Sequence, residues 1–184
     1  ITKCKIYTDR YVMDSIEYEL RILDINIADI ERKLLLLGAK KNDDYFFKRY
    51  VFETIPPKKG RWIRLRTDSD DTTLTVKQIS SNKVDGTYEK EIKISNFDVC
   101  LDMLKMMGFK PKSYQESKRS EYLYKGVQIS IDVWPNIPPF LELEAVNENT
   151  ILACLEKLGY TKKDTTALNP EKIYLEYGID IKKI

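Results

Sequence analysis

The chain has 184 residues, 42% of them hydrophobic and 33% charged, and its 31 basic and 29 acidic residues leave a net charge of +2. Such a balance excludes the strong positive field that nucleic-acid-binding and membrane-surface proteins use, so neither a nucleic acid nor a membrane is an expected partner. The sequence contains no histidine, which excludes Ser–His and Cys–His nucleophiles and His-ligated zinc and leaves catalysis to carboxylates, Lys, Tyr, Arg and a hard metal.

The length suits one domain over residues 1–184, and no linker divides it. Met13 is a candidate initiator, which would make residues 1–12 an extension. Cys4, Cys100 and Cys154 form no CxxC pair, and the last two lie on the apolar faces of expected helices. Buried free thiols, no signal peptide and no apolar run of about 20 residues together predict a cytoplasmic protein.

The first predicted strand is "SIEYELRI", in which charged and apolar residues alternate. In a strand of this sequence Glu17, Glu19 and Arg21 share one face, and the residues between them are apolar. One ionic face is typical of a solvated sheet surface. It also suits a site that holds a metal and a highly charged anion.

Three helices are predicted, each after an E-x-E strand, with an Asn N-cap and a closing Gly. The caps are Asn26 and Gly38, Asn96 and Gly108, and Asn147 and Gly159, and the E-x-E pairs are Glu17/Glu19, Glu89/Glu91 and Glu142/Glu144. After the first two helices, Lys48-Arg49 and Lys118-Arg119 follow at equal distances in Tyr-rich strands. We interpret the pattern as two duplicated halves that share a pseudo-symmetric sheet.

The remaining predicted strands also alternate. They are "RWIRLRT" with Arg64 and Arg66 on one face, "TLTVKQ" with Lys77, and "VQISIDVW" with Asp132. Taken with the E-x-E strands, they give six strands with one ionic and one apolar face. If the sheet curls into a barrel, the charges point inward, where each must be paired or must contact a ligand.

Opposed carboxylates and cations favour a metal and a polyanion. Mg²⁺ takes a few carboxylates together with phosphate oxygens, and Arg presents planar donors to phosphate. A charged interior of this kind could grip a triphosphate and stabilise charge on a transferred phosphoryl group. The sequence has no Gly-rich phosphate loop, so it is not a P-loop enzyme.

The ordered motifs "IEYELR", "WIRLR", "TLTVKQ", "YEKEIKI", "SKRSEY", "ISIDVWPNIPPFLELEA" and "IYLEYGIDI" resemble the CYTH family, also called triphosphate tunnel metalloenzymes. The resemblance covers nearly the whole chain from Ile16 and is greatest to proteins similar to class IV adenylyl cyclase. It implies an α+β fold with a closed antiparallel β-barrel flanked by helices, whose tunnel binds a triphosphate with Mg²⁺ or Mn²⁺.

The resemblance also implies roles for individual residues. The implied metal ligands are Glu17, Glu19, Asp132, Glu142 and Glu144. The implied substrate-binding residues are Arg21, Arg64, Arg66, Lys77, Arg119, Glu89 and Glu91, and the catalytic set is Glu17, Glu19, Arg21 and Lys77. The family motif is usually E-x-E-x-K, and here Arg21 replaces the Lys. Because Arg does not deprotonate, it cannot act as a general base, and a carboxylate or a metal-bound hydroxide must do so.

Three functions follow as hypotheses. The leading one is a metal-dependent triphosphatase acting on tripolyphosphate, ATP or thiamine triphosphate, as a monomer or a homodimer. The alternative is a class IV adenylyl cyclase that makes cyclic AMP and pyrophosphate from ATP, with Trp62, Tyr88 or Trp134 as candidates to stack on the base. The third is a non-catalytic module that binds polyphosphate or a nucleotide.

Overall fold

A computed structural model describes residues 16–68, 70–79 and 87–181, with only the backbone described at 16, 17 and 87. Cys4, Met13 and the proposed extension 1–12 lie outside the described residues. The strands are β1 (Ile16–Ile22), β2 (Lys40–Glu53), β3 (Arg61–Thr67), β4 (Thr72–Ile79), β5 (Thr87–Ile94), β6 (Pro111–Tyr124), β7 (Val127–Val133) and β8 (Phe140–Ala145). The helices are α1 (Ile27–Leu37), α2 (Phe97–Met106), α3 (Glu148–Leu158) and α4 (Pro170–Glu176), with a short 3₁₀ turn at Lys162–Asp164.

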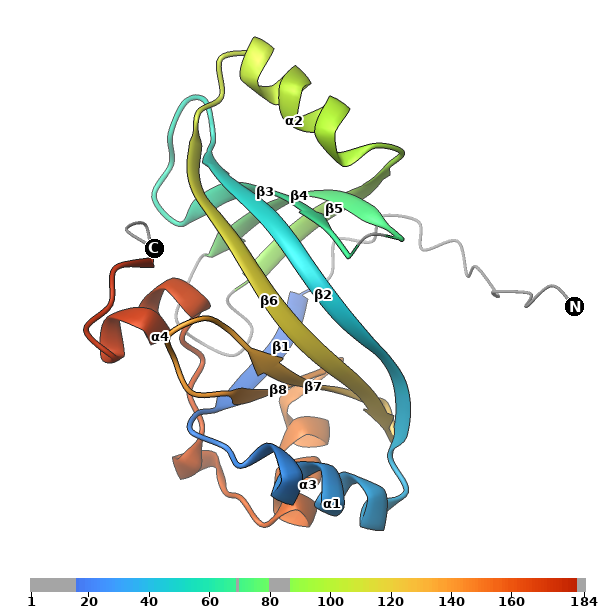
Figure 1. Cartoon of the computed structure of the whole chain (residues 1–184). Helices are drawn as coiled ribbons and strands as arrows, with labels where there is room; N and C mark the ends of the chain where they lie inside the picture. Colours follow the sequence, from blue (N-terminus) through green and yellow to red (C-terminus); the bar gives the residue numbers. More distant parts are fainter. Residues whose placement is uncertain (1–15, 69, 80–86, 182–184) are drawn as a thin grey trace, which may run out of the picture.

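The strands form one strongly curled antiparallel sheet in the order β1-β5-β4-β3-β2-β6-β7-β8. The long strands β2 and β6 cross the front of the molecule and join β3, β4 and β5 to the group formed by β1, β7 and β8 (Figure 1). β1 pairs with β8 over five residue pairs, whereas it meets β5 only at Ile16–Tyr88 and Glu17–Thr87. The α+β class and the curled antiparallel sheet are as predicted, and this short β1–β5 junction completes the ring of pairings.

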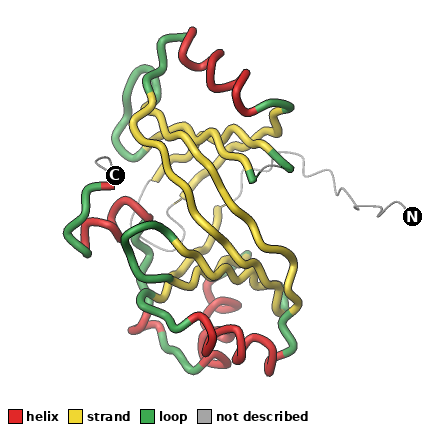
Figure 2. Tube along the Cα trace, in the orientation of Figure 1, coloured by secondary structure: helices red, strands yellow, loops and turns green. Residues whose placement is uncertain are grey.

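Helices cover the convex face of the sheet at its two ends, as the tube in Figure 2 shows. α1 and α3 pack on β1, β7 and β8 around a core that includes Ile30, Leu34, Leu143 and Leu155. α2 covers β2 and β3 through Leu101 and Leu104. Cys100 and Cys154 are buried free thiols in these two cores, as predicted.

The three predicted N-caps and the closing glycines of α1 and α3 are confirmed, whereas the C-cap of α2 is Met107 and the predicted Gly108 follows it with φ of 89°. Asn26, Asn96 and Asn147 each accept a hydrogen bond from the backbone N–H three residues later, which satisfies one of the donors left free at a helix start. Gly38 and Gly159 end their helices with φ of 72° and 82°, a conformation that costs glycine little.

A third apolar cluster lies where β7 ends and β8 begins. It joins α4 to the intervening loop through Ile173, Tyr174, Trp134 and Phe140. The segment before α4 is tied to β1, because Arg21 and Thr166 exchange two backbone hydrogen bonds of 2.8 Å. The C-terminal segment therefore lies against the end of the sheet at which β1, β2, β4 and β7 finish. In the part of the chain that the structure describes, no helix has the length and apolar character needed to cross a membrane.

The strand registers support the duplication. Arg49 on β2 is opposite Arg66 on β3, and Arg119 on β6 is opposite Asp132 on β7. The same number of residues separates Asn26 from Asn96, Gly38 from Gly108 and Arg49 from Arg119. It also separates Glu19 from Glu89. The second Glu of the first E-x-E pair, Glu19, therefore matches the first Glu of the second pair, Glu89. In the same way, Arg21 matches Glu91.

Candidate active site

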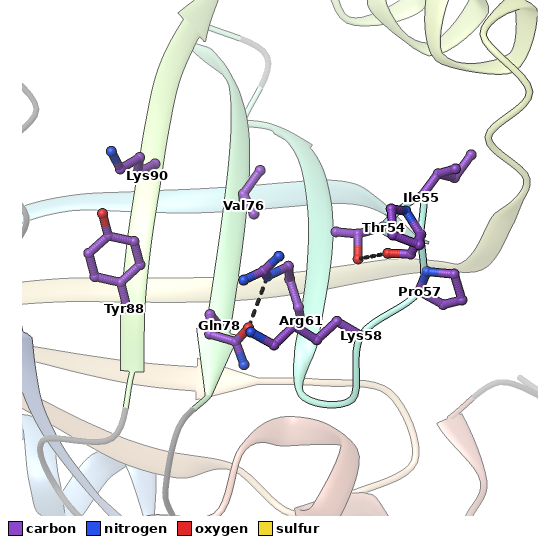
Figure 3. Close-up of a pocket in the computed structure, with 10 residues that line it drawn as sticks. Thr54, Ile55, Pro57, Lys58, Arg61, Val76, Gln78, Tyr88 and Lys90 are labelled. Atoms are coloured by element: carbon purple, nitrogen blue, oxygen red, sulfur yellow. Dashed lines mark hydrogen bonds between the residues drawn. The ribbon is translucent and has the colours of Figure 1, made fainter.

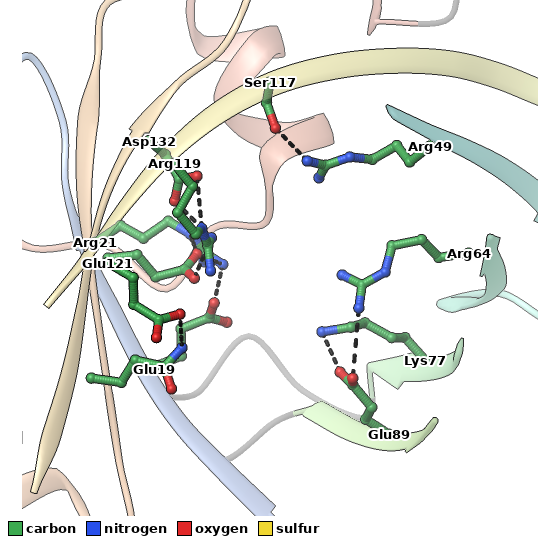
Figure 4. Close-up of polar contacts among 12 residues, drawn as sticks. Glu19, Arg21, Arg49, Arg64, Lys77, Glu89, Ser117, Arg119, Glu121 and Asp132 are labelled. Atoms are coloured by element: carbon green, nitrogen blue, oxygen red, sulfur yellow. Dashed lines mark hydrogen bonds and ion pairs between the residues drawn. The ribbon is translucent and has the colours of Figure 1, made fainter. Parts of the chain in front are cut away.

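The concave face of the sheet collects almost every predicted site residue. Successive side chains of a strand point to opposite faces, so the apolar residues face the helices and the charged ones face inward. The described inward-facing predicted residues are Glu19, Arg21, Arg64, Arg66, Lys77, Glu89, Glu91, Arg119, Asp132, Glu142 and Glu144. Figure 4 shows side chains from opposite strands pointing toward one another. Glu17 lies in β1, and its side chain is outside the described residues.

We call the part of this face formed by β1, β6, β7 and β8 the acidic wall. Its centre is Glu142, which accepts hydrogen bonds from Arg21 Nε at 2.9 Å and from Arg119 Nη2 at 2.8 Å. Arg119 also forms a bidentate pair with Asp132, at 3.0 and 2.7 Å. Arg21 additionally donates to Glu19 and, at 2.8 Å, to the carbonyl of Leu168. Every cation of this network is therefore engaged by carboxylates.

Burial changes the proton affinity of these carboxyl groups. Desolvation raises the pKa of Glu19 to about 8, and the nearby Glu142 adds to the rise while Arg21 opposes it. Burial alone would also raise the pKa of Glu142, but Arg119 and Arg21 hold it well below its ordinary value. Two neighbouring carboxyl groups with opposite shifts are typical of sites that divide acid and base roles.

The facing part, formed by β2, β3, β4 and β5, is the basic wall. Lys77 pairs with Glu89, and Arg64 lies 3.2 Å from Glu91. Thr75, fully buried, donates to Glu91 at 2.6 Å. The Arg64–Glu91 pair is more open to solvent than the Arg119–Asp132 pair of the acidic wall, with the Glu91 side chain 34% exposed against 1% for Asp132.

Two further cations of the basic wall contact aromatic rings and, among the described residues, form no ion pair with a carboxylate. The Arg66 guanidinium lies 4.6 Å from the centre of the Phe47 ring, and that of Arg49 lies 4.3 Å from the Trp134 ring. Burial, and next the charge of Arg64, lower the pKa of Arg66 to about 9. Burial likewise lowers the pKa of Arg49 well below its ordinary value, and Arg64, Arg66 and Arg119 add to the effect. Glu91 and Glu89 oppose the shift of Arg66 and Asp132 opposes that of Arg49, but in both cases burial and the neighbouring arginines outweigh them.

Sequence reasoning missed Arg49 as a site residue. It treated Lys48-Arg49 as a basic pair, yet neighbouring residues of a strand face opposite sides, and Lys48 is exposed while Arg49 is buried and faces inward. The missed signal was alternation, since Arg49 shares its face with Phe47 and lies opposite Arg66.

The three aromatic candidates for stacking on a base lie in different places. Trp62 is opposite Lys77 and shares the concave face with Arg64. Trp134 is buried against Arg49 and Tyr174. Tyr88 faces outward and lines a separate surface pocket of about 600 Å³ with Val76, Lys90 and the β2–β3 loop (Figure 3). Among the side chains that the structure describes, no predicted phosphate or metal residue lines that pocket.

The carboxylates suit Mg²⁺ or Mn²⁺, because hard divalent metals take oxygen ligands. Glu19 and Glu142 lie close enough for each to shift the pKa of the other, and an elevated carboxyl pKa beside a second carboxylate is what a bound cation would relieve. Among the side chains that the structure describes, no three acidic residues are gathered as a ready metal site. The donor chemistry fits, and binding would require Glu19 or Glu142 to exchange its guanidinium contact for the metal.

Comparison with known proteins gives a family and a fold. The model of the CYTH domain matches residues 15–167. A protein from Pyrococcus horikoshii OT3 superimposes with a TM-score of 0.74 at 22% identity, over 83% of this chain and 96% of its own. A candidate adenylate cyclase from Vibrio parahaemolyticus has a TM-score of 0.74 at 15% identity, over 89% and 99%.

A third solved structure is a Hippeastrum protein, described as a candidate adenylyl cyclase with a dominant triphosphatase activity. It has a TM-score of 0.60 at 14% identity, over 90% of this chain and 96% of its own. No curated protein matches the sequence. At these identities the likeness to solved structures is a likeness of fold.

Proposed function

The chain belongs to the CYTH domain family, and from this premise we propose that it is a divalent-metal-dependent enzyme that acts on a triphosphate held at the concave face. The observation that carries the proposal is the set of inward-facing cations on the basic wall. Among the described residues, Arg49 and Arg66 have aromatic or hydroxyl contacts and no hydrogen bond or ion pair to a carboxylate, although Arg49 is buried and Arg66 is partly buried. Buried guanidinium groups require an anion, and a chain of phosphoryl groups supplies several charges within a short length.

We propose hydrolysis of the terminal phosphoanhydride as the reaction. A water molecule attacks the terminal phosphorus, the bond from that phosphorus to the bridging oxygen breaks, and orthophosphate and the shortened phosphate leave. Arg64, Arg66 and Lys77 hold the phosphoryl oxygens and balance the charge that develops on them. Arg21 cannot take the proton of the attacking water because guanidinium groups do not deprotonate.

Glu19 is the candidate proton acceptor. It lies on the wall that faces the phosphate-binding cations. Its pKa of about 8 means that it holds a proton at neutral pH, and a cation bound beside it would lower that pKa and free the carboxylate to accept a proton. Glu19, Asp132, Glu142 and Glu144, with Glu17, are the residues that would hold Mg²⁺ or Mn²⁺. A metal bound there would neutralise phosphate charge and lower the pKa of its bound water.

Cyclisation of ATP is the second candidate. Trp62 favours it, because its ring shares the concave face with Arg64 and so is available to a base whose phosphates contact the basic wall. In this reaction the ribose 3′-oxygen attacks the α-phosphorus and pyrophosphate leaves. The candidate cyclase names of two structural neighbours are consistent with it.

The test is to incubate the protein with Mg²⁺ or Mn²⁺ and, in parallel, tripolyphosphate, ATP and thiamine triphosphate, and to resolve the products by ³¹P NMR and chromatography. Orthophosphate release identifies a triphosphatase. Cyclic AMP with pyrophosphate identifies a cyclase. Metal-dependent binding without either product would contradict enzymatic function and favour the binding module.

A further inference from the structure

Arg49 is built into the concave face as a fixed cation with spare donors. Its side chain is 7% exposed, and one terminal nitrogen donates to the hydroxyl of Ser117 across the β2–β6 pair. Its Nε has no hydrogen-bond partner among the described residues. A buried polar nitrogen without a protein partner is rare in folded proteins, and such a group binds an ordered water, an ion or a ligand.

The equivalent residue in the other half is paired with carboxylates. Arg119 occupies the matching place on β6, and it contacts Asp132 and Glu142 through three hydrogen bonds. The residue opposite Arg49 is Arg66, where Arg119 has Asp132. The same position thus contacts carboxylates on the acidic wall and lies opposite a second cation on the basic wall, so an anionic ligand is favoured beside Arg49 and Arg66.

Trp134 fixes the guanidinium in place. Its ring lies 4.3 Å from Arg49 and meets the Tyr174 ring edge to face at 6.2 Å. The Tyr174 hydroxyl donates to the carbonyl of Pro135, the residue after Trp134. α4 therefore holds the aromatic ring against which Arg49 lies, and this cation–π contact leaves the N–H groups of the guanidinium available to an anion.

The cations of the basic wall form a row across three adjacent strands. Lys77 is on β4, Arg64 and Arg66 are on β3, and Arg49 ends the row on β2. Neighbouring strands are about 4.8 Å apart and successive residues of a strand about 3.3 Å apart, so the row runs about 10 Å across the strands and, since Lys77 is opposite Trp62 and Arg49 is opposite Arg66, about 13 Å along β3. A linear chain of three phosphoryl groups spans more of such a row than pyrophosphate does.

We propose that Arg49 is a further phosphate-binding residue, positioned by Trp134 and through it by α4, and that it selects tripolyphosphate over pyrophosphate. This rests on the proposed function, because it assigns part of the same triphosphate to a residue that the motifs do not include. Arg49 binds the phosphoryl group farthest along the row from Lys77.

The test measures binding of tripolyphosphate and pyrophosphate with Mg²⁺ by isothermal titration calorimetry. Arg49→Met removes the charge and keeps the length of the side chain. It should weaken the binding of tripolyphosphate by about 10–100-fold, the range expected when charged hydrogen bonds are lost. The binding of pyrophosphate should be weakened by clearly less. The matched control is Arg61→Met, also an arginine on a barrel strand, which faces outward to Gln78 and should change neither affinity.

Trp134 is tested through its coupling to Arg49. Trp134→Leu should weaken tripolyphosphate by about 3–10-fold, in keeping with a partly buried cation–π contact, and should add nothing when combined with Arg49→Met. Trp134→Phe, which keeps an aromatic face, should restore most of the affinity. An equal loss from Trp134→Leu in the Arg49→Met background would mean that Trp134 acts only through packing.

The outcomes separate the two proposals. If the unaltered protein binds no tripolyphosphate, the proposed function fails and this inference falls with it. If the unaltered protein binds and Arg49→Met binds equally well, only the role of Arg49 is overturned. If thermal unfolding shows that Arg49→Met does not fold, Arg49→Lys replaces it. Lys keeps the charge but lacks the planar donors of Arg, so the affinity for tripolyphosphate should still fall. An unchanged affinity in Arg49→Lys would contradict the proposal.

Discussion

The two walls of the concave face are built from equivalent strands and carry different charges. The registers pair Arg66 with Asp132, Lys77 with Glu144 and Glu91 with Arg21 as matching positions in the two halves. In each pair a cation on one wall corresponds to a carboxylate on the other. Two positions keep their charge, since Glu19 matches Glu89 and Arg49 matches Arg119.

This difference shows how a duplicated fold acquires a polar axis. Two identical walls would offer a ligand no preferred direction. Because the charge is reversed at three matching positions, carboxylates gather on β1, β7 and β8, and cations gather on β2 and β3. A metal is therefore favoured on the acidic wall and a polyphosphate on the basic wall. We expect the largest effects from changes that remove this contrast.

The strongest test of the acidic wall is Glu144→Gln. We expect loss of metal-dependent turnover by more than about 100-fold, because removing a metal ligand costs more than the 10–100-fold typical of its outer partners. The substitution keeps the shape of the side chain, so the melting temperature should change little. Phosphate release with Mn²⁺ and thermal unfolding measure the two effects, and persistent activity would contradict the assignment of Glu144 to the metal.

The next largest effect contrasts the ion pairs of the two walls. Glu142→Gln should lower the free energy of unfolding by about 3 kcal/mol, because it leaves the buried Arg21 and Arg119 with an unbalanced charge. Glu91→Gln, at a pair more open to solvent, should cost about 0.5 kcal/mol. Urea unfolding measures both, and equal losses would show that burial does not distinguish the walls.

Glu91 also predicts a pH dependence of stability. Burial alone would raise its pKa, but the hydroxyl of Thr75 and the charge of Arg64 lower it overall. A carboxyl whose folded-state pKa is depressed stabilises the fold fully above about pH 4.5, and the contribution is lost as the pH falls through the lower pKa. Urea unfolding between neutral and acid pH should therefore show a smaller loss of stability in Glu91→Gln than in the unaltered protein.

A third change removes the charge contrast at one position. Arg66→Asp gives the basic wall the residue found at the matching position of the acidic wall. Tripolyphosphate affinity should fall by at least about 10–100-fold, because one charged contact is lost and a repulsive one replaces it. Arg61→Asp on the outer face is the control. Calorimetric affinity that stays unchanged in Arg66→Asp would place the phosphate elsewhere.

The smallest expected effect concerns the support from α4. Tyr174→Phe removes the hydrogen bond to Pro135 and should lower stability by about 1 kcal/mol. Since the ring still packs on Trp134, tripolyphosphate affinity should fall only slightly. A loss of affinity as large as that in Arg49→Met would mean that the hydrogen bond, rather than the stacking, fixes Arg49.

The sequence by itself determined the local structure and the family. Asn26, Asn96 and Asn147 predict helix starts, because each side chain caps the turn that follows it. Alternation in "IEYELR" or "WIRLR" assigns each residue to one face of a strand. Both effects act within a few positions of the chain. The sequence also identified the charged residues of six strands as one set. The order of the motifs, rather than any single one, led to the CYTH family.

Only the tertiary structure decided which charges meet. Glu142 binds Arg21 and Arg119, which are far from it in the chain, and this depends on strand order and register. The pattern could not distinguish Arg49 from Lys48 as a site residue. The surroundings that make Arg49 a site residue are formed by Ser117, Trp134 and Arg66, which belong to other elements. Nor could the pattern place Tyr88 outside and Trp62 inside. Pairing partners and burial are long-range properties, and they turn equivalent strands into one acidic and one basic wall.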